Sequence, residues 1–289
     1  MSDANHPAPG GIDALLPSEI AEKAEAVGVQ KTRLDAASLL GLAVLAGAFI
    51  ALGAMFATTV LAGTAGTLPW GVARLLAGLV FCLGLILVVV GGAELFTGNA
   101  LMVMALASRK VRLGEVLRAW AIVYLGNFVG ALGTAGLVFL SGQYLAGKGV
   151  VAVVALDLAL GKAVEPFDHA LFLAILCNVL VCLAVWLTLG ARTTADKVLA
   201  VIFPVSAFVV AGFEHSVANM YLLPLGLFIK AWAPAELWLQ LGTTPADFAA
   251  LTWSAFVANL VPVTIGNIIG GGGLVGGVYW FIYLRQRPR

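Results

Sequence analysis

The sequence predicts an all-α membrane protein in which six transmembrane helices form two inverted three-helix repeats. Of the 289 residues, 61% are hydrophobic and 11% are charged, whereas soluble domains carry about a quarter charged residues. Six long apolar stretches follow one another along the chain, and each can cross a bilayer as a helix. The second and fifth are interrupted by short polar segments. Irregular backbone inside a membrane must be covered by protein or line a wet cavity, so these interruptions predict a pore or vestibule.

The two polar segments indicate an internal duplication. They are Gly92-Ala-Glu-Leu-Phe-Thr-Gly-Asn99 and Gly212-Phe-Glu-His-Ser-Val-Ala-Asn219, so glycine, glutamate and asparagine recur at one offset of 120 residues. A second match follows each copy, Gly126-Asn127-x-x-Gly130 and Gly266-Asn267-x-x-Gly270. Three spans per copy require the second copy to be inverted. Inverted repeats with broken helices are typical of transport sites near the middle of the membrane.

The chain before the first span is expected to lie outside the membrane. Residues 1–11 are rich in proline, alanine and glycine and predict a mobile tail. Residues 17–28 predict a short helix, because a proline and acidic residues open it and Gly28 closes it. The polar start is not typical of a cleavable signal peptide, so the first span itself is expected to direct insertion.

Each span is bounded by turn-forming or charged residues. The first, 36–61, contains glycines that permit close helix packing. The second is expected at 70–90, with an interruption at 91–99 and an apolar continuation to 107, and three basic residues separate it from the third. The remaining spans are expected at 116–140, 169–189, 198–229 (interrupted at 213–219) and 253–284. The segments 141–166 and 230–252 are expected to be connecting loops.

Basic residues predict that both termini lie in the cytoplasm. Alternate loops hold twelve lysines and arginines on the side of the termini and four on the other side, and cytoplasmic loops are enriched in these residues. The predicted parts are a cytoplasmic tail and short helix (1–35), a transmembrane channel domain (36–285) and a cytoplasmic C-terminal tail (286–289). The two repeats of the channel domain are expected at about 36–141 and 166–285.

Composition and motifs argue against several other classes of protein. The net charge is only +1, which disfavours a nucleic-acid partner. Cys82, Cys177 and Cys182 lie in apolar stretches without a Cys-x-x-Cys pair, so they are expected to be buried small residues. Neither a Gly-Lys-Thr/Ser loop nor clustered histidine and cysteine occurs, so no enzyme activity, cofactor or metal site is expected. A neutral-solute pore is disfavoured because paired Asn-Pro-Ala motifs are missing and both interruptions contain glutamate.

The polar residues of the interruptions are the candidates for function, because ionisable side chains are costly inside a membrane. A lone intramembrane histidine such as His215 can be a core residue bonded to a backbone carbonyl, but its place in a repeated interruption favours a functional role. Glu94 and Glu214 recur at matching positions, which favours a structural role over ion handling. Four asparagines are expected mainly to satisfy backbone groups: Asn99 and Asn219, Asn127 and Asn267.

Three segments resemble the signatures of the formate/nitrite transporter family: Glu94-Leu-Phe-Thr-Gly98, Gly212-Phe-Glu-His-Ser-Val-Ala-Asn-Met220 and Val263-Thr-Ile-Gly-Asn-Ile-Ile-Gly270. The likeness covers nearly the whole chain, and Met220-Tyr-Leu-Leu-Pro-Leu-Gly226 is most like the formate channels. The resemblance implies an aquaporin-like protomer, a homopentamer with one pathway per protomer, and a bacterial inner (cytoplasmic) membrane. The expected solute is formate or formic acid, and nitrite or hydrosulfide is the alternative within the family.

The resemblance also implies roles for individual residues. His215 would be the central polar residue, with Thr97 facing it, Asn178 on the pathway, and Glu214 and Asn219 in the same central site. Lys162 would lie at an outer vestibule, although a solvated loop charge is an equal alternative. The implied gating loop comprises Gly91, Gly92, Glu94, Gly98 and Asn99. The implied apolar constrictions comprise Phe81, Leu85, Leu95, Phe96 and Phe208, which would otherwise be ordinary core residues.

A histidine at such a site could move a weak acid by supplying a proton. Free histidine has a pKa of about 6.5 and a carboxylic acid about 4, so proton transfer from histidinium to a carboxylate in water is uphill by roughly 3.5 kcal/mol. In a dry constriction the comparison is between an ion pair and a neutral pair, and desolvation favours the neutral pair. Neutral formic acid would then cross an apolar barrier more easily than formate.

Overall fold

The structure is a computed structural model that describes residues 13–286, and over that range it contains helices and turns without a strand. Within the described residues, six helical segments are long and apolar enough to cross a membrane: α2 (Ala36–Leu61), α3 (Trp70–Gly91), α6 (Leu113–Leu140), α8 (Phe167–Gly190), α9 (Thr194–Ala211) and Pro245–Tyr283. There are up to seven when α10 (Ser216–Trp232) and α11 (Ala235–Leu241), bent by 104°, count as one span. The predicted all-α class with about six apolar helices is confirmed. The tail predicted at residues 1–11 lies outside the described residues.

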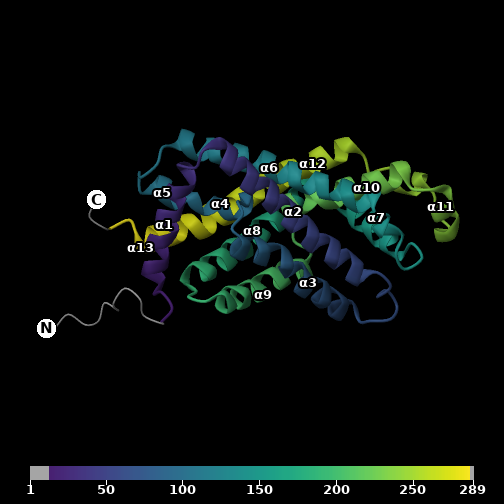
Figure 1. Ribbon diagram of the computed structural model, residues 1–289, viewed down its shortest axis with the longest axis horizontal. Helices are drawn as coiled ribbons and strands as arrows, with labels where there is room; N and C mark the ends of the chain where they lie inside the picture. The colour runs from purple at the N-terminus through teal and green to yellow at the C-terminus, as the bar shows by residue number, and fades with distance from the viewer. Residues whose placement is uncertain (1–12, 287–289) are drawn as a thin grey trace.

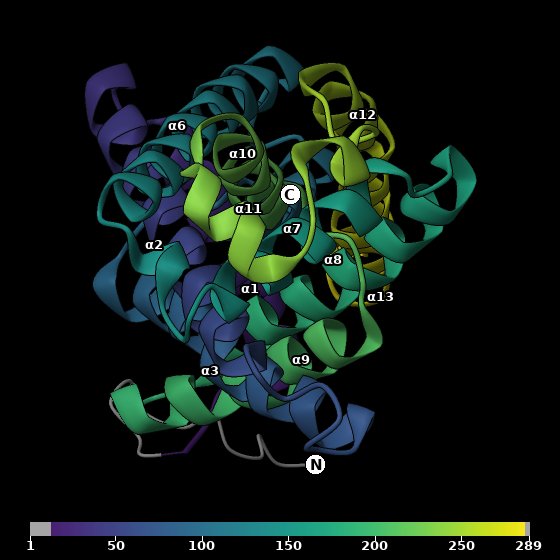
Figure 2. The same cartoon turned by 90° about the vertical axis from the view of Figure 1, so that its right-hand side faces the viewer.

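The long helices cross one another obliquely and form an elongated bundle (Figure 1). The short helices α1 (Pro17–Thr32) and α13 (Val278–Tyr283) lie at one end of this bundle, and α7 (Val150–Ala163) and α11 lie at the other (Figure 1). Viewed from the α11 end, α10 lies inside the bundle (Figure 2). It packs against α2, α6, α7 and α12 (Trp253–Ile268), so its N-terminal residues are held near the centre of the molecule.

Close helix contacts through glycine hold the bundle together. A Cβ added to Gly130 on α6 would lie 2.0 Å from the carbonyl oxygen of Val44 on α2. A Cβ added to Gly270 would lie 2.1 Å from the carbonyl oxygen of Ile175 on α8. The same close approach therefore occurs at both positions of the repeated Gly-Asn-x-x-Gly motif. Small residues let helix backbones approach in a membrane, where packing replaces the hydrophobic effect between helices.

Both polar segments separate consecutive helices. After α3, the chain turns at Gly92 (φ 79°) and continues as α4 (Phe96–Asn99), η1 (Ala100–Met102) and α5 (Val103–Ala107). After α9, it turns at Gly212 (φ 73°) and continues as α10. Glycine adopts this left-handed conformation without steric cost, so the repeated glycines end one helix and free the next residues to turn inward.

Three expectations about the helices need correction. The segment 141–166, expected to be a loop, contains η2 (Gln143–Leu145) and the whole of α7. The segment 230–252 contains α11 and η3 (Pro245–Phe248). Both segments are too short or too polar to be recognised as spans, but α7 packs against α10, and this tertiary contact favours a helix. The helix expected to end at Gly28 continues to Thr32, because Gly28 is a close contact to Ala105 rather than a terminus.

The last span contains a wide helical turn. Between α12 and α13, residues Ile269–Gly277 form a π-helix that includes the glycine run of this segment. A Cβ on Gly271 would lie 2.4 Å from Nδ2 of Asn178 and 2.6 Å from Sγ of Cys182. The glycines therefore let this helix approach α8 closely.

Candidate functional site

His215 lies at the centre of the bundle, directly before α10. It is the N-cap of that helix, and its Nδ1 accepts a hydrogen bond from the N–H of Ala218 at 3.1 Å. A neutral imidazole that accepts at Nδ1 carries its proton on Nε2. This Nε2 lies 3.0 Å from Oγ1 of Thr97, so Nε2–H donates to the threonine hydroxyl. The helix cap therefore fixes the tautomer and aims the ring at the first polar segment.

Thr97 and Asn178 connect the histidine to the other half of the chain. Nδ2 of Asn178 donates to the carbonyl oxygens of Thr97 (3.1 Å) and Asn267 (2.6 Å). Its Oδ1 is buried and has no hydrogen-bond partner among the described residues. Buried amide oxygens are rarely left unpaired. The Oγ atom of Ser216, the residue after His215, is also buried without a hydrogen-bond partner among the described residues.

Each polar segment carries a cluster of glutamate, asparagine and lysine. In the first, Oε2 of Glu94 accepts from Nζ of Lys31 and from Nδ2 of Asn99, both at 2.8 Å. In the second, Glu214 accepts from Nζ of Lys162 at 2.6 Å and from Nδ2 of Asn219 at 2.5 Å. Each glutamate thus lies between a lysine from another element and the asparagine five residues further on. Their charges are compensated where they are buried, as intramembrane carboxylates require.

The asparagines of the Gly-Asn-x-x-Gly motifs support the two polar segments. Oδ1 of Asn127 accepts from the N–H of Phe96, and its Nδ2 donates to the carbonyls of Ala43 and Glu94. Oδ1 of Asn267 accepts from the N–H of Ser216 at 2.9 Å, and its Nδ2 donates to the carbonyls of Ala174 and Glu214 at 2.9 and 3.0 Å. Each of these asparagines therefore satisfies two backbone carbonyls and the first N–H of the helix that begins after a polar turn, α4 for Asn127 and α10 for Asn267.

Two cavities approach the centre from opposite ends of the bundle. The α1-side cavity, about 270 Å³, is lined by parts of α1, α3 and the first polar segment. The α7-side cavity, about 230 Å³, is lined by parts of α2, α3, α7, α9 and the second polar segment, including His215. The described gating-loop candidates Gly92, Glu94, Gly98 and Asn99 line the first cavity. Gly91, the last residue of α3, is not part of either lining.

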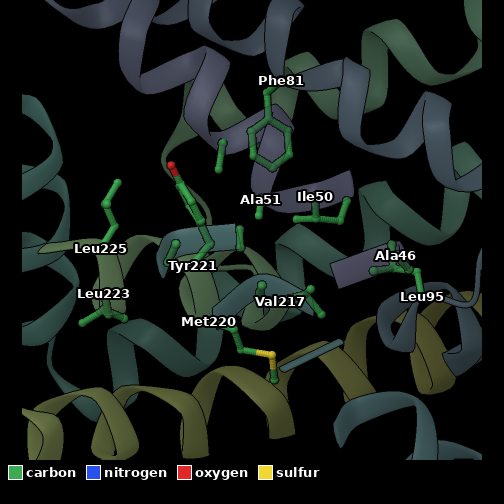
Figure 3. Close-up of a cluster of buried hydrophobic side chains, with 14 of the residues drawn as sticks. Ala46, Ile50, Ala51, Phe81, Leu95, Val217, Met220, Tyr221, Leu223 and Leu225 are labelled. Atoms are coloured by element: carbon green, nitrogen blue, oxygen red, sulfur yellow. The ribbon is translucent and has the colours of Figure 1, made fainter. Parts of the chain in front are cut away.

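Apolar side chains contribute to the walls of both cavities. Phe81 and Phe208 line the α7-side cavity, and their rings meet edge to face at a centroid distance of 5.5 Å. Leu85, one helical turn after Phe81, and Leu95 line the α1-side cavity. Figure 3 shows Phe81 and Leu95 within the buried cluster that also surrounds the first turns of α10. Of the predicted constriction residues, Phe81 and Phe208 thus lie in the wall of one cavity, and Leu85 and Leu95 lie in the wall of the other.

The structure places Phe96 differently from the other constriction candidates. Its ring packs edge to face on Tyr124 at 4.9 Å and on Trp120 at 6.0 Å, and it lines neither cavity. Phe96 thus anchors the start of α4 against α6.

Lys31 and Arg74 are polar residues at the site that sequence reasoning did not single out. Lys31 completes the first cluster, and Arg74 lines the α7-side cavity. A signal for Lys31 was present. Lys31 lies five residues before α2, which begins at residue 36, and Lys162 lies five residues before α8, which begins at residue 167. This offset of 131 differs from the 120 of the polar segments, so a search at one offset does not find it.

Comparisons with known proteins agree on one family. The profile described as "Formate/nitrite transporter" matches residues 18–281. The formate channel FocA of Escherichia coli K12 is 45% identical over 276 residues, which cover 95% of this chain and 96% of the relative. FocA of Haemophilus influenzae is 40% identical, covering 91% and 93%.

Two solved structures also resemble the fold. A pentameric formate channel with formate bound superposes with a TM-score of 0.82 at 42% identity, covering 86% of this chain and 98% of that one. An FNT family ion channel superposes with a TM-score of 0.78 at 28% identity, covering 92% and 99%.

Proposed function

The chain belongs to the formate/nitrite transporter family, and from this membership we propose that it is a membrane channel that moves formate or formic acid. The observation that carries the proposal is the pair of cavities that approach His215 and Thr97 from opposite ends of the bundle. Relatives named as formate channels and a neighbour with formate bound support the choice of solute. The described residues contain no group of three or more side chains that could hold a metal.

The proposed path runs from one cavity to the other through the apolar layers. A formate ion that leaves the aqueous cavities loses its hydration, and an unpaired charge in an apolar environment costs several kcal/mol or more. The neutral acid avoids most of this cost. We therefore place the barrier at Phe81, Leu85, Leu95 and Phe208, and the polar step between them at His215.

In this mechanism His215 and Thr97 handle one proton. Protonated histidine in the α7-side cavity would transfer its proton to formate, because desolvation favours the neutral pair over the ion pair. The hydroxyl of Thr97, 3.0 Å from Nε2, would guide the acid. The unpaired Oδ1 of Asn178 offers an acceptor for the O–H of formic acid. Because the neutral ring carries its proton on Nε2, the second proton of histidinium enters at Nδ1 and displaces the bond from the N–H of Ala218, and Nε2 then passes its proton to formate.

Glu94 and Glu214 have structural roles in this proposal. Each is held by a lysine and an asparagine, so neither offers a free carboxylate to the path. Glu214 and Asn219 shape the wall of the α7-side cavity beside His215, and Lys162 compensates the charge there. The segment from Gly91 to Asn99 is the proposed gating loop, tied to α1 through Lys31.

We propose that the architecture consists of inverted repeats with two broken helices. Support comes from contacts that recur at matching positions: the asparagine that satisfies a helix N–H, the glutamate–asparagine–lysine cluster, and the glycine contact with the preceding helix. The excess of basic residues on one side supports cytoplasmic termini and an inner-membrane location. The domain boundaries at 35 and 285, the aquaporin-like protomer and the homopentamer complete the proposal, and a pentameric structural neighbour supports the last point.

Flux measurements in liposomes test the proposed solute. We expect the purified chain to move formate faster than nitrite or hydrosulfide, and Thr97→Val to reduce formate flux by about tenfold, because removing one positioned hydrogen bond costs roughly 1.5 kcal/mol. The matched control is Thr67→Val, since Thr67 bonds only its own turn at an exposed site. Nitrite or hydrosulfide moving as fast as formate would leave the family intact and remove the formate assignment.

A further inference from the structure

The α7-side cavity has two basic side chains in its wall, and only one of them is neutralised by a carboxylate. Lys162 and Arg74 both line this cavity. Nζ of Lys162 lies 2.6 Å from Glu214, so the field of this lysine on a solute is largely cancelled. Arg74 takes part in none of the ion pairs among residues 13–286. A guanidinium stays protonated at any physiological pH, so Arg74 keeps its full charge at the cavity.

The position of Arg74 follows from the close crossing of α3 and α9. A Cβ on Gly78 would lie 2.9 Å from the carbonyl oxygen of Ser206, so the two helices touch there. One turn earlier on α3, Nη2 of Arg74 donates to the carbonyl of Val209 at 2.7 Å, and Nε lies 3.5 Å from the carbonyl of Val210. The last carbonyls of a helix lack partners and carry partial negative charge, so a cation is favourable at this place.

These bonds hold the guanidinium in place and leave some of its N–H donors free of protein carbonyls. A guanidinium has five N–H donors, and the carbonyls of α9 engage two of its nitrogens. The same side chain lies over the ring of Trp70 at 5.9 Å. Arg74 is half-buried, so its charge acts partly through protein rather than through bulk water, where screening would be stronger.

The other cavity lacks an equivalent group. Its lining contains one basic side chain, Lys31, which is paired with Glu94 at 2.8 Å. The position 120 residues after Arg74 is Thr194, which is uncharged. The described residues therefore give the α7-side cavity a charge that the duplication does not repeat.

We propose that Arg74 is the anion-capture residue of the α7-side cavity: its uncompensated guanidinium raises the local concentration of small carboxylates before they reach His215. This inference rests on the proposed function, because it assigns the residue that selects the ionic form at the same site. The planar fork of an arginine suits a carboxylate, which matches the shape of formate. Asp157, which is exposed and lines the same cavity, opposes this attraction.

The first test measures formate uptake from the α7 side as a function of formate concentration and salt. Because the guanidinium of Arg74 is not ion-paired, we expect Arg74→Gln to raise the half-saturating formate concentration about threefold at low salt, and less at high salt, where the attraction is screened. Arg74→Lys keeps the charge and should stay close to the parent, and Asp157→Asn should shift the value the other way. Lys230→Gln is the matched control, because Lys230 also bonds carbonyl oxygens but lines neither cavity.

Two outcomes would overturn the proposal. If Arg74→Gln leaves half-saturation unchanged, the charge does not capture the solute. If Arg74→Lys and Arg74→Gln lose flux equally and without salt dependence, Arg74 has only a structural role, through its hydrogen bonds to α9.

A second test does not depend on transport and so separates this inference from the proposed function. Quenching of the fluorescence of Trp70, isolated as the difference from a Trp70→Phe variant, reports solutes near Arg74. We expect Arg74→Gln to lower quenching by iodide at least twofold and to leave quenching by neutral acrylamide unchanged. Equal iodide quenching in both proteins would contradict the proposal, even if the channel moved formate normally.

Discussion

The side chains that matter most for the centre are amides placed to satisfy backbone groups. Asn267 alone pairs the N–H of Ser216 and the carbonyls of Ala174 and Glu214. It therefore joins α8, the second polar segment and α10 at one point. The position of His215 depends on this amide, because the amide bonds the backbone on both sides of it, at the carbonyl of Glu214 and the N–H of Ser216.

We expect Asn267→Ala to lower the free energy of unfolding by about 3 kcal/mol or more, because each buried polar group left unpaired costs roughly 1–3 kcal/mol. Thermal unfolding in detergent measures the effect. Gln240→Ala is the control, since Gln240 makes one exposed bond to the carbonyl of Lys148. A stability loss no larger than that of the control would mean that the polar segment is held by other contacts.

The residue roles divided into those visible from the sequence and those that needed the fold. The repeated motifs identified both glutamates, His215 and the paired asparagines as candidates for the central site. The lysine partners of the two glutamates could not be predicted, because Lys31 and Lys162 lie outside the polar segments. Their spacing is 131 residues, whereas that of the polar segments is 120. In the sequence, Arg74 was only one of the four basic residues counted on the side opposite the termini. Its contact with α9 could not be predicted, because it depends on how α3 and α9 cross.

At the scale of elements, helix packing is governed by a few glycines at which backbones touch. On α6, Gly130 and Gly133 differ sharply in their surroundings. A Cβ on Gly130 would meet the backbone of Val44 and Ala48 at 2.0 and 2.9 Å, whereas a Cβ on Gly133 would have no neighbour within 4 Å. The two positions therefore provide a matched pair within one helix.

We expect Gly130→Ala to abolish or severely reduce folded protein, because neither backbone can yield without separating α2 and α6. Gly133→Ala should leave the amount of folded protein unchanged, or raise stability by about 1 kcal/mol through helix propensity. Size-exclusion profiles of the two purified variants decide the point. Normal folding of Gly130→Ala would show that the close contact is dispensable.

The spans were predictable at this scale because apolar length and bounding residues define them. The six apolar stretches lie within about a turn of the helices, and the second and fifth are divided where the polar segments were expected, between α3 and α4 and between α9 and α10. The helix α7 was missed, since its 14 residues are too short for a span and contain Asp157 and Lys162. Its helical form depends on packing against α10, which local sequence does not encode.

At the scale of the whole molecule, the account predicts one path with a single polar step between two cavities. In the proposed path, His215 lies in the wall of the α7-side cavity, and its Nε2 lies 3.0 Å from Oγ1 of Thr97 in the first polar segment. The ion-paired glutamates lie on the cavity walls. Under the proposed mechanism, proton transfer at His215 would determine whether formate crosses as an anion or as an acid.

The most direct measurement is the number of protons that accompany each formate across a sealed membrane. Formate uptake, internal pH and electrical current are recorded in parallel on liposomes with the parent chain, His215→Asn and the exposed-site control His169→Asn. We expect about one proton per formate, with little net current, for the parent and the control, and loss of proton-coupled uptake in His215→Asn. Formate uptake that carries current without acidifying the interior, or a His215→Asn variant with unchanged coupling, would contradict the central claim.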